Sequence, residues 1–100
     1  MGLTVQIEDE RGEREGDPWW HQRLNEVLIA ERPETRCLRF IDPYGNTVFN
    51  QVQLPVLLEE LREVRKRLSD AELRTVVDTL STMVQRAASE AHTYIRFIGD

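Results

Sequence analysis

The sequence predicts an α+β fold in a single domain, residues 1–100, because two strand-like segments flank a long helical region. Segments 38–42 (LRFID) and 95–100 (IRFIGD) nearly repeat each other. In both, aliphatic and aromatic residues alternate with arginine, which is typical of a strand with one buried face. We therefore expect a small antiparallel or mixed four-stranded sheet, covered by an α-helical hairpin over 54–91, with an additional short N-terminal helix.

The first strand is expected at residues 3–8, where Leu3, Val5 and Ile7 alternate with polar residues. The acidic segment that follows, residues 8–17, holds six acidic and two basic residues and two glycines. It has no further apolar anchor, so we expect a mobile turn or a loose hairpin.

A helix is predicted over residues 18–31. Asp17 suits the N-cap position and Pro18 the first helical position, while Pro33 ends the element. The apolar run at 27–30 is also compatible with a strand, and the sequence leaves that alternative open.

A β-hairpin is predicted over residues 37–49, with strands at 37–41 and 47–49. The intervening turn has a physical basis, because Pro43 presets its own φ and Gly45 tolerates left-handed conformations. Asp42 is placed to accept a hydrogen bond from a backbone N–H in this turn.

Two consecutive helices are predicted next, the first ending near Leu68 and the second running for about 20 residues. Ser69 and Glu72 match a capping box, in which Ser69 caps the second helix. A short connection favours antiparallel packing of the two helices. The final strand is expected at residues 93–98.

Composition excludes several classes of function. The formal charge is −5, which disfavours a nucleic-acid-binding role because phosphate contacts need clustered positive charge. No apolar run approaches the length of about 20 residues that spans a bilayer, so no membrane partner is expected. A lone cysteine, Cys37, fits a reducing compartment, and we expect a cytoplasmic protein.

The adjacent residues Trp19 and Trp20 are the first candidate binding residues. Neighbours on a helix point about 100° apart, so both indoles cannot enter one core equally, and one is expected to be at least partly exposed. Exposed tryptophan is enriched in protein interfaces. A second interpretation, equally weighted, makes the exposed indole a lid over the sheet edge.

The second set of candidate binding residues comprises Asp42, Tyr44, Asn46 and Asp100. If strands 37–41 and 93–98 pair in parallel, Asp42 and Asp100 meet at one edge of the sheet. Such oxygen-rich groups bind divalent cations or transfer protons. The favoured interpretation is that Asp42 and Asn46 serve turn geometry, so no catalytic residue, metal site or cofactor is assigned.

The segments CLRFIDPYGNTVFN (37–50) and YIRFIGD (94–100) resemble a set of small bacterial proteins of unknown function. The resemblance covers roughly a quarter of the chain. It implies a bacterial cytoplasmic origin and a natural end at Asp100, and it carries no activity, ligand or catalytic residue.

The sequence therefore favours a non-enzymatic protein–protein interaction module of the bacterial cytoplasm, which includes the case of a homodimer. The alternative is a small metal-dependent or acid/base enzyme that uses the loop 42–50 and Asp100.

Overall fold

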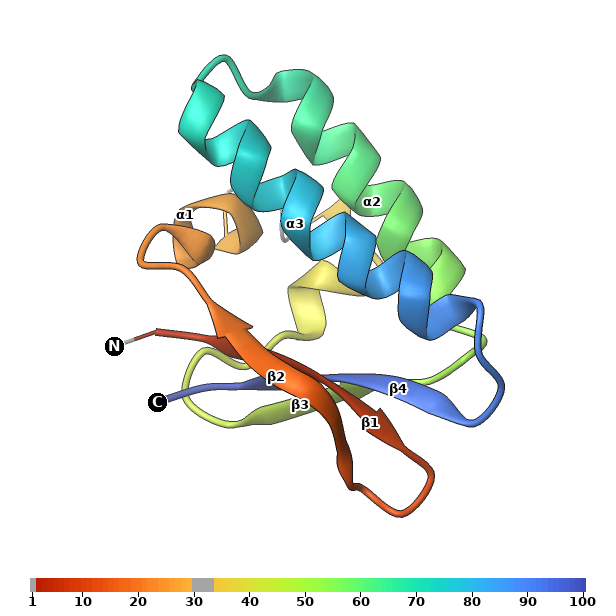
Figure 1. Ribbon diagram of the computed structural model, residues 1–100. Helices are drawn as coiled ribbons and strands as arrows, with labels where there is room; N and C mark the ends of the chain where they lie inside the picture. Colours follow the sequence, from red (N-terminus) through yellow and green to blue (C-terminus); the bar gives the residue numbers. More distant parts are fainter. Residues whose placement is uncertain (1, 30–33) are drawn as a thin grey trace.

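The computed structural model describes residues 2–29 and 34–100 (Figure 1). This part of the chain forms an α+β structure with three α-helices and a four-stranded antiparallel sheet in the order β2-β1-β4-β3. The predicted α+β class with a four-stranded sheet is thus confirmed. The elements are β1 (Thr4–Asp9), β2 (Arg14–Trp20), α1 (Leu24–Ile29), the 3₁₀ helix η2 (Leu38–Phe40), β3 (Asn46–Phe49), α2 (Leu54–Arg67), α3 (Ala71–Ala88) and β4 (Thr93–Ile98).

All three α-helices lie on the same side of the sheet, and α3 contacts both α2 and β4 (Figure 1). Alternate residues of β4, including Ile95 and Phe97, are buried on that side. The ring of Phe97 packs edge-to-face on Phe49 of β3, with centroids 5.9 Å apart. The apolar stripes of α2 and α3 complete the core, so the helical periodicity of the sequence corresponds to real burial.

The predicted helix over 18–31 is wrong in its first half. Residues 18–20 belong to β2, and α1 begins at Leu24; residues 30–31 lie outside the described residues. Pro18 has no N–H to donate, and it is tolerated because β2 is an edge strand that pairs with β1 alone.

The acidic segment 8–17 is a β-hairpin turn with its flanking strand residues, and the register of β1 with β2 shifts between Val5 and Ile7. Asp9 Oδ1 accepts hydrogen bonds from the N–H groups of Arg11 and Glu13, both at 2.9 Å. Gly12 has a φ of +79°, which lets the chain reverse inside this turn. After this turn the chain enters β2 at Arg14. Asp17 and Pro18 therefore lie within a strand and do not start a helix.

The predicted strand 37–41, and with it the hairpin 37–49, is wrong. Residues 38–40 form the 3₁₀ helix η2, with N–H of Phe40 donating to the Cys37 carbonyl at 3.0 Å. β3 does form at the predicted place, but it pairs with β4. Leu38 is buried and Phe40 exposed, so the two side chains do not share a face.

Glu60 of α2 explains the conformation of this segment. Its Oε1 accepts hydrogen bonds from the N–H groups of Cys37 and Leu38, both at 3.1 Å, and its Oε2 accepts one from Arg36 N–H. Three consecutive backbone donors are therefore bound by one carboxylate, whereas in a strand successive N–H groups point to opposite sides. The near repeat of 38–42 and 95–100 gives two different structures for this reason.

The predicted helical hairpin has the right elements but the wrong cap. Asp70, not Ser69, is the N-cap of α3, and its Oδ1 accepts from the N–H groups of Glu72 (2.9 Å) and Leu73 (3.2 Å). A carboxylate at this position also interacts favourably with the helix dipole, which a serine hydroxyl does not.

Candidate functional site

Trp19 and Trp20 project to opposite sides of the sheet, because successive residues of a strand alternate. Trp19 is paired with Val5 and packs against the core, where it lines a cavity of about 270 Å³ with Thr82 and Met83. Trp20 lies on the other side and is 67% exposed. The expected exposure of one indole is confirmed, although strand geometry rather than helix geometry produces it.

We call the side of the sheet that faces away from the helices the open face, because none of the described elements lies against it in Figure 1. Residues paired across antiparallel strands share a face, so the register defines its rows. The first row is Trp20, Thr4, Ile98 and Asn46.

The second row of the open face is Gln6, Arg96 and Val48, and the third is Arg14, Glu8 and Tyr94. Val48 is 42% exposed, on the edge strand opposite to the strand that carries Trp20. Val48, Ile98 and Tyr94 are not among the binding residues expected from the sequence. The alternation of β4 was the available signal, because it places Tyr94 and Ile98 on the same side as Arg96.

An ion pair between the buried Glu8 carboxylate and the partly exposed Arg96 guanidinium lies on the open face. Arg96 Nε donates to Glu8 Oε2 at 2.6 Å, and the Gln6 side-chain amide donates to the same oxygen. Glu8 is only 3% exposed although it faces away from the helices. Its neighbours in the sheet thus already neutralise and desolvate this carboxylate.

The turn that contains Asp42, Tyr44 and Asn46 is held by its own polar groups. Asp42 Oδ1 accepts from the Tyr44 N–H at 2.9 Å, and the Asp42 N–H donates to Thr47 Oγ1 at 2.9 Å. The Tyr44 side chain is exposed. Asp42 therefore has the turn-forming role that the sequence favoured.

Asp100 lies beside this turn, but not through the parallel strand pairing that was considered. The antiparallel pairing of β3 with β4 brings the ends together, and the Asp100 N–H donates to the Pro43 carbonyl at 3.1 Å. Among residues 2–29 and 34–100, no group of three or more His, Cys, Asp or Glu side chains is arranged to hold a metal ion.

Trp20 and Asp100 also line a common surface cavity of about 350 Å³ at this end of the sheet. Its other lining residues are Gly2, Leu3, Thr4, His21 and Gln22. The sequence-predicted residues thus separate into two groups. Trp20, Asn46 and Asp100, with the turn at 42–44, gather at one end of the sheet, whereas Trp19 faces the helices.

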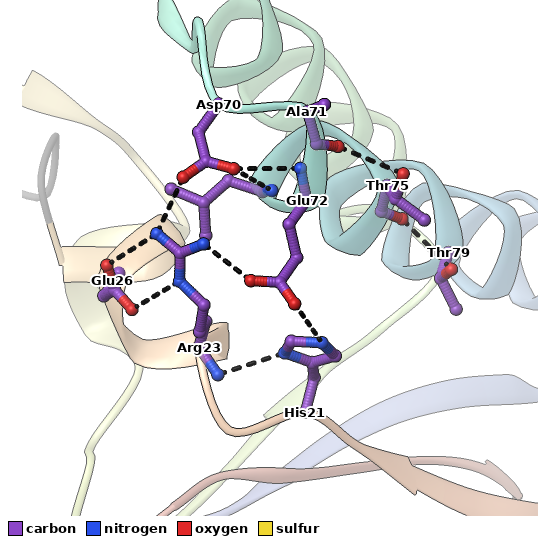
Figure 2. Close-up of polar contacts among 9 residues, drawn as sticks. His21, Arg23, Glu26, Asp70, Ala71, Glu72, Thr75 and Thr79 are labelled. Atoms are coloured by element: carbon purple, nitrogen blue, oxygen red, sulfur yellow. Dashed lines mark hydrogen bonds and ion pairs between the residues drawn. The ribbon is translucent and has the colours of Figure 1, made fainter.

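A second polar cluster surrounds Arg23 and joins the β2–α1 turn to the start of α3 (Figure 2). The guanidinium contacts Glu26 at 2.9 Å, Asp70 at 2.9 Å and Glu72 at 2.6 Å. Hydrogen bonds from Arg23 lower the pKa of Glu26 and, together with the backbone N–H of Leu73, that of Asp70.

His21 belongs to the same cluster. Its Nδ1 accepts from the Arg23 N–H at 3.1 Å, and its Nε2 lies 4.0 Å from Glu72 Oε2 (Figure 2). Both ring nitrogens thus face other members of this cluster, which joins the β2–α1 turn to the start of α3.

The basic segment at the end of α2 is engaged within the helical pair. Arg65 Nε and Nη2 donate to the two carboxylate oxygens of Asp78, at 2.6 and 3.1 Å. Lys66 lies 3.5 Å from Glu63. These contacts partly compensate the positive charge of Arg65 and Lys66.

Comparisons with protein-family models, curated proteins and solved structures found no match. The site must be interpreted from its own chemistry. No helix in the described part of the chain is long and apolar enough to cross a membrane. The Cys37 thiol is buried, and desolvation raises its pKa, which suppresses thiolate chemistry.

Proposed function

We propose that this chain is a non-enzymatic protein–protein interaction module of the bacterial cytoplasm, and that the open face is its contact surface. The observation that carries the proposal is the indole of Trp20, which is 67% exposed on a sheet face that also exposes Val48. Large aromatic side chains that a partner can desolvate supply much of the energy in protein interfaces.

The rigidity of the face also supports this role. Trp20, Thr4 and Ile98 are held in register by β1 and its two neighbouring strands, so little conformational entropy is lost on binding. Cytoplasmic location is supported by the lone, buried thiol of Cys37.

The enzymatic alternative depends on Asp42, Tyr44, Asn46 and Asp100. Asp42 already accepts a backbone hydrogen bond within its turn, and Tyr44 projects into solvent. The acid/base or metal alternative is therefore the weaker of the two.

The proposal is tested by capturing partners from host-cell extract with the full chain and identifying them by mass spectrometry. Each partner is then purified, and its affinity for variant chains is measured by calorimetry. Val48→Asp changes the open face, whereas Val52→Asp makes the same change at a valine in the β3–α2 loop that is 83% exposed.

We expect Val48→Asp to weaken binding by about tenfold or more, which is about 1.4 kcal/mol, and Val52→Asp to leave it unchanged. Circular dichroism controls for folding, and Trp20→Ser serves as a second variant of the face. Equal affinity of the wild type, Val48→Asp and Trp20→Ser chains would refute the open face as the contact surface.

A further inference from the structure

The charge of the open face differs from that of the whole chain. The chain carries −5, but in the three rows defined above the charged side chains are Glu8, Arg14 and Arg96. Glu8 is neutralised by Arg96 within the same face. The three rows together carry one acid and two bases, so two copies of an acidic chain repel each other less at this face than at their acidic surfaces.

This charge pattern selects among possible occupants. A basic partner would be attracted to acidic surface, and the open face has no net negative charge. A nucleic acid would need several free cations, and Arg96 is already bound to Glu8. Resting on the proposed function, we propose that the occupant of the open face is a second copy of this chain, packed face to face.

The ion pair of Glu8 and Arg96 lowers the cost of such packing. Covering a charged group normally costs free energy because its hydration is lost. Glu8 is already 3% exposed, and its Oε2 accepts from both Arg96 and Gln6. A second sheet can therefore cover the centre of the face without leaving the Glu8 carboxylate unpaired.

The two edge strands expose side chains of different size on the open face. Trp20 is a large side chain on β2, and Val48 is a small one on β3, at opposite edges of the sheet. A two-fold axis parallel to the strands places β2 of each copy over β3 of the other. Each Trp20 then lies over β3 of the second copy, in the row of Asn46 and one row from Val48, and such an isologous arrangement closes as a dimer.

The area of the open face determines how strongly two copies are expected to associate. Strands about 4.8 Å apart with a rise of about 3.3 Å per residue give a projected area of roughly 250 Å². A standard interface buries about 800 Å² of accessible surface per partner. We therefore expect a weak, reversible dimer whose population depends on concentration.

The test is sedimentation equilibrium of the full chain from about 10 µM to about 1 mM, a range suited to weak association. The wild type is expected to shift from monomer to dimer as concentration rises. Val48→Asp is expected to raise the dimer dissociation constant by about tenfold or more, whereas Val52→Asp, the matched change away from the face, leaves it within about twofold.

Fluorescence gives an independent readout. In a Trp19→Phe chain, Trp20 is the sole tryptophan. Its emission is expected to shift to shorter wavelength as concentration rises, because the indole loses water contact, and this shift is expected to be absent when Val48→Asp is added.

A wild-type chain that stays monomeric throughout overturns self-association, and so does a dimer that Val48→Asp and Val52→Asp weaken equally. Neither result refutes the proposed function by itself. That proposal fails separately, if a purified partner binds the Val48→Asp and Trp20→Ser chains as tightly as the wild type.

Discussion

Gly99 lies so close to Pro43 that a Cβ atom on residue 99 would be 2.5 Å from the Pro43 carbonyl oxygen. The Gly99 N–H also donates to the Gly45 carbonyl at 2.6 Å. The end of β4 and the turn at 42–45 are therefore joined by direct backbone contact, which requires glycine at position 99.

We expect Gly99→Ala to displace this turn and to destabilise the protein by about 1–3 kcal/mol, the usual cost of overpacking. Chemical unfolding measures the loss, and faster amide exchange at Asp100 reports the loosened contact. Gly2→Ala is the control, because a Cβ at Gly2 meets no atom within 4 Å. Equal stability of the two variants would contradict the assigned contact.

The cap of α3 distinguishes Asp70 from Ser69. Asp70→Ala is expected to lower the melting temperature, since the N–H groups of Glu72 and Leu73 lose their acceptor and Arg23 loses a partner. Ser69→Ala is expected to stay within about 0.5 kcal/mol of the wild type. Thermal melts measure the effect of each variant on the melting temperature. A larger effect of Ser69→Ala than of Asp70→Ala would show that Ser69 is the N-cap.

The ion pair on the open face can be tested by a double-mutant cycle. Arg96→Leu leaves the buried Glu8 carboxylate without its cation and is expected to cost about 1–3 kcal/mol of unfolding free energy. The double variant Glu8→Leu, Arg96→Leu is expected to recover part of that loss, because no buried charge remains. A double variant less stable than Arg96→Leu would disprove this explanation.

The helical pair is expected to dominate stability. Leu61 and Leu80 are completely buried, and truncating either to alanine is expected to cost about 2–5 kcal/mol. Val52→Ala is the exposed control and is expected to change stability by less than about 0.5 kcal/mol. Denaturant titration measures all three, and losses below about 1 kcal/mol at both leucines would place the core elsewhere.

Acid is expected to destabilise the protein through Asp70 and Asp78. Hydrogen bonds from Arg23 and Arg65 lower their pKa values in the folded chain below the ordinary value of about 3.9. The unfolded chain therefore takes up these protons first, so the stabilisation is complete above about pH 4 and is lost as the pH falls through the folded pKa values.

Melting temperatures measured from about pH 7 to about pH 2 should show this loss, with the steepest decline below about pH 4. Asp78→Asn is expected to start from a lower melting temperature and to decline less steeply, because one of the linked carboxylates is absent. A variant curve parallel to that of the wild type would show that the ion pair contributes nothing to acid stability.

The sequence by itself determined the elements in which buried residues recur at the regular spacing of a strand or a helix. The alternation in β1 and β4 and the apolar stripes of α2 and α3 each follow from local periodicity. The exposure of one of two adjacent tryptophans also follows, because neighbouring side chains diverge in either kind of element.

Tertiary structure alone decided the conformation of 38–40 and the strand at 18–20. The first depends on Glu60, which lies more than 20 residues away and binds the N–H groups that a strand would have shared. The second depends on pairing with β1, which Pro18 permits at an edge. Both outcomes affect the composition of the sheet that carries the open face. Neither can be predicted from the local sequence pattern, because that pattern does not show which group satisfies a backbone donor.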